Sequence, residues 1–281
     1  YLGEGWEQSA GDPATWEAVE DIPARELWDV RNAMRADLIA YARERSAIDR
    51  LARGEPMEYV SEALRAFDEN VLMVGFARRA ASYKRLYLLT LDPGRALSLL
   101  DGPRSMQLLI AGKPHPQDEE GKRIIQRVFE LKWAPHVTQR AAFLEDYNLD
   151  MAAKLVAGCD VWLNVPRPPL EASGTSGMKV ALNGGMNVSV LDGWWAEAYD
   201  GTNGWAIGSH PTSDHAAQDA QDAASMYDVL EHEVLPLFYA RDEEGVPQGW
   251  VTRVKASIRT LAPQFCATRM LQDYRRGFYA P

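Results

Sequence analysis

One segment of the chain concentrates positive charge. It reads Arg78-Arg79-Ala80-Ala81-Ser82-Tyr83-Lys84-Arg85, with four cations and no anion, although the whole chain has 30 Lys and Arg against 40 Asp and Glu. The segment follows an apolar run at residues 71–76 that is typical of a buried strand, and we expect it to open a helix over residues 82–91. Unpaired N–H groups at a helix start attract anions, so the segment predicts a phosphate site. A solvated basic helix face is the alternative, and the position directly after a core strand favours the anion site.

A second segment combines small residues with a lysine. Residues 166–179 read Pro-Arg-Pro-Pro-Leu-Glu-Ala-Ser-Gly-Thr-Ser-Gly-Met-Lys. The prolines stiffen the start of the turn, and Gly174 and Gly177 let the backbone approach a ligand closely. Ser173 and Thr175 are suitable helix caps, and Lys179 would lie in the first turns of the next helix, where its free amine is available for a Schiff base. The spacing is not that of a Walker loop, and such small-residue turns are often ordinary loops.

Taken together, the two segments resemble motifs of the α-glucan phosphorylases. Residues 171–184 resemble the stretch around that family's pyridoxal-phosphate lysine, and residues 78–85 resemble its phosphate-binding segment. Further matching motifs follow in the family's order, namely residues 143–147, 160–164, 191–195, 237–242 and 269–274. The resemblance covers the chain from Trp6 onward. Residues 166–168 and the pair Trp194-Trp195 are similar to the short bacterial and archaeal branch of the family.

The resemblance implies both a fold and an activity. The family consists of retaining glucosyltransferases with two Rossmann-like lobes, the GT-B type. Its members cleave terminal α-1,4 bonds of glycogen, starch or maltodextrin with orthophosphate and release glucose 1-phosphate. The implied cofactor is pyridoxal 5′-phosphate, which would act through its phosphate in a proton relay to the glycosidic oxygen. The implied partners are an α-1,4-glucan, orthophosphate or glucose 1-phosphate, and the first lobe of the same enzyme.

The resemblance also assigns roles to individual positions. Lys179 would anchor the cofactor, with Tyr147 against its ring. The cofactor phosphate would be held by Thr175, Gly174, Arg78 and Lys84. Arg79, with Lys84, would bind the substrate phosphate, so the implied catalytic residues are Arg79, Lys84 and Lys179. The sugar would be bound by Glu171, by the N–H groups of Ala172, Ser173 and Gly174, and by Tyr83. Outside this motif, Glu171 would be read as a carboxylate at a helix start.

The chain departs from the animal-type pattern at several places, and one of them is Arg78-Arg79 in place of a Lys-Arg pair. It has Gly-Thr-Ser-Gly-Met-Lys at residues 174–179 where the animal type has Gly-Thr-Gly-Asn-Met-Lys. Ala81-Ser82 replaces a His-Glu pair, and Asn148 replaces an Arg, so the cofactor contact made at that position is not carried over. The short branch lacks the regulatory extension of the animal enzymes. Control by phosphorylation or by AMP is therefore not expected.

Short apolar runs alternate with helical stretches from residue 71 onward. Strands are expected at residues 71–76, 108–112, 141–144, 161–165 and 186–191. Runs that are apolar throughout imply burial on both faces, so the sequence predicts an α/β fold, a Rossmann-like parallel sheet with helices on both faces. Ligands bind such sheets at the carboxyl ends of the strands. The residues that follow Phe76, Leu144, Val165 and Leu191 should therefore share one crevice.

The remaining periodicity indicates helices at both ends of the chain. Residues 24–53 predict a long amphipathic helix and residues 57–67 a short one, and helices return after residue 226. We expect residues 1–65 to be the helical end of the first lobe with its connection, and residues 66–281 to be the Rossmann-like C-terminal lobe. The chain begins at Tyr1 without a Met, which suggests a piece of a longer protein. Such a piece would lack half of the closed site and should not turn over alone.

Composition excludes several classes of function. The chain has 281 residues, of which 46% are hydrophobic and 25% charged, a globular composition. It contains no apolar run long enough for a membrane helix, and its net charge of −10 argues against a nucleic-acid binder. Cys159 and Cys266 are too few for a disulfide framework, which suggests a reducing cytoplasm. No metal site is expected, because the histidines lack ligand spacing: His115, His136, His210, His215 and His232. The carboxylates Asp214, Asp219 and Asp222 read as a solvated helix face. The oligomeric state stays open, with a homo-oligomer among the options.

Two other functions compete with phosphorolysis. A sugar-nucleotide glucosyltransferase of the glycogen synthase type would share the lobe architecture but needs no Schiff-base lysine. A non-catalytic glucan-binding domain is suggested by the nine Trp residues. Most of these, such as Trp162 within an expected strand, are better explained as core residues.

Overall fold

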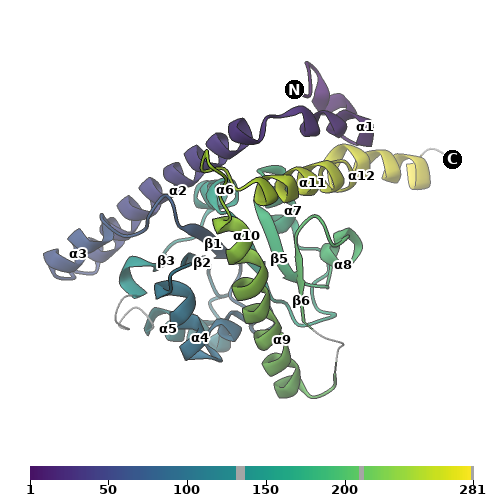
Figure 1. The fold of residues 1–281 in the computed structure, drawn as a ribbon. Helices are drawn as coiled ribbons and strands as arrows, with labels where there is room; N and C mark the ends of the chain where they lie inside the picture. The colour runs from purple at the N-terminus through teal and green to yellow at the C-terminus, as the bar shows by residue number, and fades with distance from the viewer. Residues whose placement is uncertain (131–136, 209–211, 280–281) are drawn as a thin grey trace.

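Every strand in the described part of the chain belongs to one parallel sheet (Figure 1). The computed structural model describes residues 1–130, 137–208 and 212–279. The strands are β1 (Leu72–Ala77), β2 (Met106–Ala111), β3 (Ala141–Leu144), β4 (Val161–Asn164), β5 (Met186–Val190) and β6 (Trp205–Ile207). They lie in the order β3-β2-β1-β4-β5-β6, so the direction of winding reverses between β1 and β4. The predicted α/β fold with a Rossmann-like parallel sheet is confirmed.

The strands are buried on both faces, as their apolar sequences predicted. Every residue of β1, β2, β4 and β5 is buried. Alternate side chains of β1 enter different cores, because Leu72, Val74 and Phe76 join one apolar cluster and Met73 joins another. Gly75 packs against Cys159 and Trp162: a Cβ there would be 2.5 Å from the Cys159 Sγ and 2.9 Å from the fully buried Trp162 ring. The central strands therefore pack closely enough to require glycine at this position.

Helices cover both faces of the sheet (Figure 1). One core cluster contains residues of α2 (Ala24–Ala52), α6 (Leu149–Gly158) and α7 (Thr175–Leu182). The other contains residues of α4 (Pro93–Asp101), α5 (Glu119–Glu130), α9 (His215–Val229), α10 (Leu235–Tyr239) and α11 (Gln248–Gln264). The shorter helices are α1 (Pro13–Trp16), α3 (Met57–Ala63), α8 (Trp194–Ala198) and α12 (Ala267–Tyr274). The N-terminal segment lies beside α12, away from the sheet.

Helix α2 is tied to the sheet by buried arginines. Arg31 donates hydrogen bonds to the carbonyls of Ala157, Cys159 and Asn183 at 2.5–2.8 Å, which satisfies the C-terminal ends of α6 and α7. Arg35 forms a buried ion pair of 2.6 Å with the Asp160 carboxylate, just before β4. Residues before 65 thus pack on this sheet. The proposed boundary at residue 65 itself stays a prediction.

The helix predicted over residues 82–91 is wrong. Two 3-10 turns, Ser82–Lys84 and Leu86–Thr90, occupy this stretch instead. Arg85 separates them with a φ of 51°, a left-handed conformation that interrupts a helix. Its guanidinium is fully buried and donates to the carbonyls of Val165 and Pro166, contacts that a continuous helix would not orient. An anion here would therefore meet the cationic side chains rather than a helix N-terminus.

Two smaller expectations concern histidines and membranes. His136 and His210 lie outside the described residues. His232 lies near Asp228 and Glu231, but Arg95 pairs with both carboxylates at 2.7 Å.

Among the described helices, none has the length and apolar character needed to cross a membrane.

Candidate functional site

A cavity of about 750 Å³ opens at the carboxyl end of the sheet. Its walls come from the residues that follow β1, from the start of α6 after β3, and from the loop and helix that follow β4. All of the predicted site residues except Ala172 line it: Arg78, Arg79, Tyr83, Lys84, Tyr147, Glu171, Ser173, Gly174, Thr175 and Lys179. Segments about 100 residues apart in the chain therefore meet, as expected for the loops of a parallel sheet.

The start of α7 forms the part of the wall that carries the lysine. Gly174, and not Ser173 or Thr175, is the N-cap, with a φ of 104° and no side-chain cap. A Cβ on Gly174 would lie 2.8 Å from the Trp194 ring, and one on Gly177 would lie 2.5 Å from Oδ1 of Asn187. The predicted caps are wrong because the backbone turns in a region that only glycine adopts easily. The first N–H groups of α7 consequently lack a side-chain acceptor.

Lys179 and Thr175 project from α7 at the solvent side of this wall. Both side chains are exposed, and both line the cavity. Ser176, which also lines the cavity, fixes α7 to the sheet, because its hydroxyl accepts a hydrogen bond of 3.1 Å from the Trp162 indole N–H. The helix therefore holds the amine of Lys179 at the cavity while its own position is set by the core.

The positively charged residues 78–85, here called the cation segment, supply the wall of the cavity that faces α7. Arg78 and Lys84 are buried, and both pair with the Glu171 carboxylate, Arg78 at 3.3 Å. Burial lowers the pKa of the Arg78 guanidinium, although the nearby carboxylate of Glu171 opposes this effect. The Nε atom of Arg78 is buried and has no hydrogen-bond partner in the described structure. Arg79 is exposed and forms no ion pair among the described residues. The cavity thus carries more positive than negative charge and an unused donor.

The loop after β5 supports the site from behind. The Asp192 carboxylate accepts a hydrogen bond of 2.9 Å from the Glu171 backbone N–H. The Trp194 N–H donates to the Ser173 carbonyl at 2.9 Å. Gly193 has a φ of 55°, and a Cβ there would lie 2.5 Å from the Ser173 carbonyl oxygen. Sequence reasoning quoted these residues only as part of a motif. An Asp-Gly pair at the end of a predicted strand was the signal that could have identified them as supports of Glu171.

The segment after β3 contributes an aromatic wall. Tyr147 is half-buried, and burial raises the pKa of its hydroxyl. Asn148 is the N-cap of α6, since its side chain accepts a hydrogen bond of 2.9 Å from the Met151 N–H. The residue that replaces the animal-type Arg is thus used in holding the helix that follows Tyr147.

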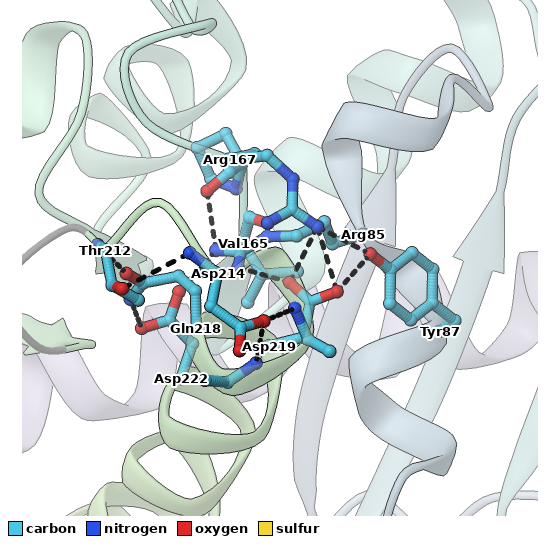
Figure 2. A network of polar contacts seen from close by, with 12 residues as sticks. Arg85, Tyr87, Val165, Arg167, Thr212, Asp214, Gln218, Asp219 and Asp222 are labelled. Carbon is cyan, nitrogen blue, oxygen red and sulfur yellow. Dashed lines mark hydrogen bonds and ion pairs between the residues drawn. The ribbon is translucent and has the colours of Figure 1, made fainter.

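The carboxylates predicted to be a solvated helix face are not all solvated. Asp222 is buried, and Asp219 lies in a network with Arg85, Tyr87 and Arg167 (Figure 2). Asp214 caps α9 by accepting from the N–H groups of residues 216 and 217. The expectation is wrong for Asp219 and Asp222 because the buried Arg85 and the partly buried Arg167 reach this face of α9 from other segments.

Comparison with known proteins identifies the family to which this arrangement belongs. The family model described as carbohydrate phosphorylase matches residues 58–207, slightly more than half of the chain. The chain belongs to the carbohydrate phosphorylase family. The matched stretch contains every residue that lines the cavity. The predicted resemblance is confirmed, and the sheet is that of an α/β lobe of the GT-B type.

Bacterial and archaeal relatives match nearly the whole chain. A protein named glycogen phosphorylase from Mycobacterium tuberculosis is 47% identical over 97% of this chain and 32% of its own length. One of the same name from Aquifex aeolicus is 44% identical over 100% of this chain and 40% of its own length. A maltodextrin phosphorylase from Thermococcus litoralis is 39% identical over 100% of this chain and 33% of its own length. The chain therefore spans about a third to two fifths of these curated relatives.

Proposed function

We propose that the protein carrying this chain performs phosphorolysis of terminal α-1,4 bonds of glycogen, starch or maltodextrin, with retention, to give glucose 1-phosphate. The proposal rests on one observation: a lysine amine, three further cations and a glycine-rich helix start converge on a single cavity. The names of the relatives support a glucan as the substrate class. Because the chain spans only part of those relatives, we propose that the first lobe supplies the remainder of the site.

The residues of the cavity fit pyridoxal 5′-phosphate as the cofactor. A phosphate needs several donors, and the cavity offers the unpartnered Nε of Arg78, the amine of Lys84 and the uncapped N–H groups of α7. Only glycine fits at residue 174, because a Cβ there would meet the Trp194 ring. We assign Lys179 as the anchor, Thr175, Gly174, Arg78 and Lys84 as the phosphate ligands, and Tyr147 as the ring contact. When bound, the cofactor would supply a phosphate that exchanges protons with the substrate phosphate.

The chain's own residues would hold the second phosphate and the sugar. Arg79 has no carboxylate partner among the described residues, so it is free to bind orthophosphate together with Lys84. Two phosphates in contact repel each other, and a dense group of cations offsets that repulsion. Glu171, Tyr83 and the N–H groups of residues 172–174 are proposed to bind glucose hydroxyls. A misplaced hydroxyl would leave a buried polar group unpaired, which would exclude epimers.

Covalent trapping tests the cofactor assignment directly. The protein is mixed with pyridoxal phosphate, reduced with borohydride, and digested for peptide mass analysis. We expect the label on Lys179, and we expect inorganic phosphate to compete with it. Lys179→Arg should remove the label, whereas Lys154→Arg, which changes an exposed lysine of α6, should not. Equal labelling of several surface lysines without competition by phosphate would contradict the proposal.

Family membership favours this function over the two alternatives. A sugar-nucleotide transferase would not need the lysine at the start of α7. The glucan-binding alternative rested on tryptophans, and seven of the nine are buried in the described structure: Trp16, Trp28, Trp162, Trp194, Trp195, Trp205 and Trp250. Trp133 lies outside the described residues. We further propose a reducing, cytoplasmic setting, which suits two free cysteines, and a first-lobe origin for residues 1–65.

A further inference from the structure

A second polar network lies next to the cavity, and the proposed function does not use it. It joins Arg85 of the cation segment, Tyr87 of the 3-10 turn that follows, Arg167 of the proline-rich loop, and the carboxylates Asp219 and Asp222 of α9 (Figure 2). These residues come from three separate parts of the chain. Arg85 directly follows Lys84 in the chain, and Arg167 lies in the loop that leads to Glu171. The contacts of the network therefore bear on two residues that line the cavity.

Arg85 is the most constrained member of the network. Its side chain is fully buried, and its backbone has a φ of 51°. The guanidinium donates to the carbonyl of Val165 at 3.0 Å and to that of Pro166 at 2.7 Å. It also pairs with Asp219 at 2.9 Å and with Asp222 at 2.7 Å. A left-handed backbone at a residue with a side chain is unfavourable, so these four contacts must hold it in place.

The left-handed turn sends neighbouring side chains to different places. Lys84 reaches Glu171 at the cavity, whereas Arg85 reaches the two carboxylates of α9. The two residues share one peptide, so any change in the backbone at residue 85 moves Lys84 as well. The anchoring of Arg85 therefore fixes the direction in which Lys84 points.

Asp219 is the shared acceptor of the network. It accepts from Arg85 Nη1 at 2.9 Å, from the Tyr87 hydroxyl at 2.6 Å, and from Arg167 Nη2 at 2.8 Å. Arg167 also donates its backbone N–H to the Tyr83 carbonyl at 2.7 Å. One carboxylate thus holds the cation segment against the loop that leads to Glu171. Both walls of the cavity depend on it.

We infer that Asp219 is a positioning residue for the anion site: through Arg85 and Arg167 it orients Lys84 and Tyr83 toward the cavity. The inference rests on the proposed function, since it concerns the same anion site. It predicts a change in anion affinity opposite to the one that charge attraction alone would give. Loss of a negative charge near a cation cluster should strengthen anion binding by Coulomb attraction alone. Loss of the positioning contacts should weaken it.

Titration of the protein with pyridoxal phosphate separates these outcomes. We expect Asp219→Asn to raise the dissociation constant roughly tenfold, the order expected when a charge-assisted hydrogen bond of the network is lost. The number of molecules bound per chain should stay unchanged. A dissociation constant equal to or below that of the wild type would overturn the inference. A lower stoichiometry with an unchanged constant would also overturn it, because that result indicates a merely structural role.

Glu231→Gln is the matched control. Glu231 lies beyond the other end of α9 and accepts two hydrogen bonds of 2.7–2.9 Å from Arg95, so the same charge is removed from a similar ion pair. We expect the dissociation constant of this variant to stay within roughly twofold of the wild type, since neither Glu231 nor Arg95 lines the cavity. A tenfold change in this control would contradict a specific role for Asp219.

A second variant protects the test against misfolding. Arg85→Lys keeps the charge but loses the planar fork, and we expect it to weaken binding in the same direction. The double variant should lose less affinity than the sum of the two single losses, because the two side chains share an ion pair of 2.9 Å. Additive effects would overturn the inference. If the wild-type chain takes no label on Lys179, the proposed function fails. If the wild type is labelled on Lys179 and the Asp219 and Arg85 variants bind pyridoxal phosphate as well as the wild type does, only the positioning role fails.

Discussion

At the residue scale, glycines decide how closely α7 approaches its neighbours. Gly177 lies within the first turn of α7, and a Cβ there would be 2.5 Å from Asn187 Oδ1 and 2.8 Å from the Trp194 ring. Asn187 cannot easily move, because it is buried and donates to the Gly177 carbonyl at 3.1 Å. The start of the helix that carries Lys179 is thus held against the sheet by the absence of a side chain.

Gly177→Ala should therefore destabilise the protein in spite of the higher helix propensity of alanine. We expect a loss of about 1–3 kcal/mol in the free energy of unfolding, the usual cost of overpacking. Gly94→Ala in α4 is the matched control, since its Cβ would meet only Asp92 Oδ1 at 3.4 Å. Urea denaturation of both variants gives the comparison. Equal stability of the two variants would contradict the close packing at Gly177.

The pH dependence of stability should report on Asp219. Burial would raise the pKa of this carboxyl, but hydrogen bonds from Tyr87, Arg85 and Arg167 together lower it below its ordinary value of 3.8. A lowered pKa in the folded state favours the charged form. The carboxylate therefore stabilises the fold above the unfolded-state pKa, and this contribution is lost as the pH falls through the folded-state pKa.

We expect Asp219→Asn to be less stable than the wild type at pH 7, and the gap in melting temperature to shrink as the pH falls below about 4. Thermal melts at a series of pH values measure it. Glu231→Gln serves again as the comparison, because it removes the same charge from an ion pair with Arg95 beyond the other end of α9. A gap that is constant from pH 7 to pH 3 would show that the charge of Asp219 does not stabilise the fold.

At the element scale, long periodic segments were predictable and special backbone conformations were not. The five strands predicted from apolar runs all form, with ends within two residues of the prediction. Helix α2 was predicted at residues 24–53 and spans Ala24–Ala52. Arg85 defeated the prediction of a helix after β1, because its left-handed backbone depends on distant carboxylates of α9. Strand β6 was missed since its three residues are too few to show a period.

The joining of α2 to the site-bearing helices gives a prediction at this scale. Arg31 caps both α6 and α7 through three carbonyls, and it lies 3.6 Å from the Asp160 carboxylate. Arg31→Met should lower the free energy of unfolding by about 3–5 kcal/mol, because it leaves buried acceptors and part of a buried charge unpaired. Arg25→Ala, on the same helix but in an exposed pair with Asp29, should change stability by about 0.5 kcal/mol or less. Urea denaturation measures the loss in each variant. Equal losses in the two variants would argue against the capping role of Arg31.

At the scale of the whole molecule, the sequence placed the cavity better than it described its contacts. The order of strands and motifs was enough to bring Arg78, Lys84 and Lys179 to one edge of a parallel sheet. The pairing of Glu171 with two cations could not be derived, because it depends on loop conformations rather than on periodicity. Asp219 could not be derived for the same reason, because it acts across a contact between segments that the sequence does not reveal.

The cavity also lies open on one side, which leads to a prediction about activity. Lys179, Thr175 and Arg79 are exposed, and apolar side chains on its wall are exposed as well, Leu149 at 87% and Leu182 at 44%. Transfer of a glucosyl group to phosphate, the proposed reaction, must exclude water, since water would compete with phosphate for the glucosyl group. The 281-residue chain alone should therefore bind pyridoxal phosphate at Lys179 yet release no glucose 1-phosphate from maltodextrin. A coupled assay with glucose 1-phosphate as the readout checks this, and the protein extended by the proposed first lobe should be active. Turnover by the isolated chain would show that a single lobe closes the site unaided.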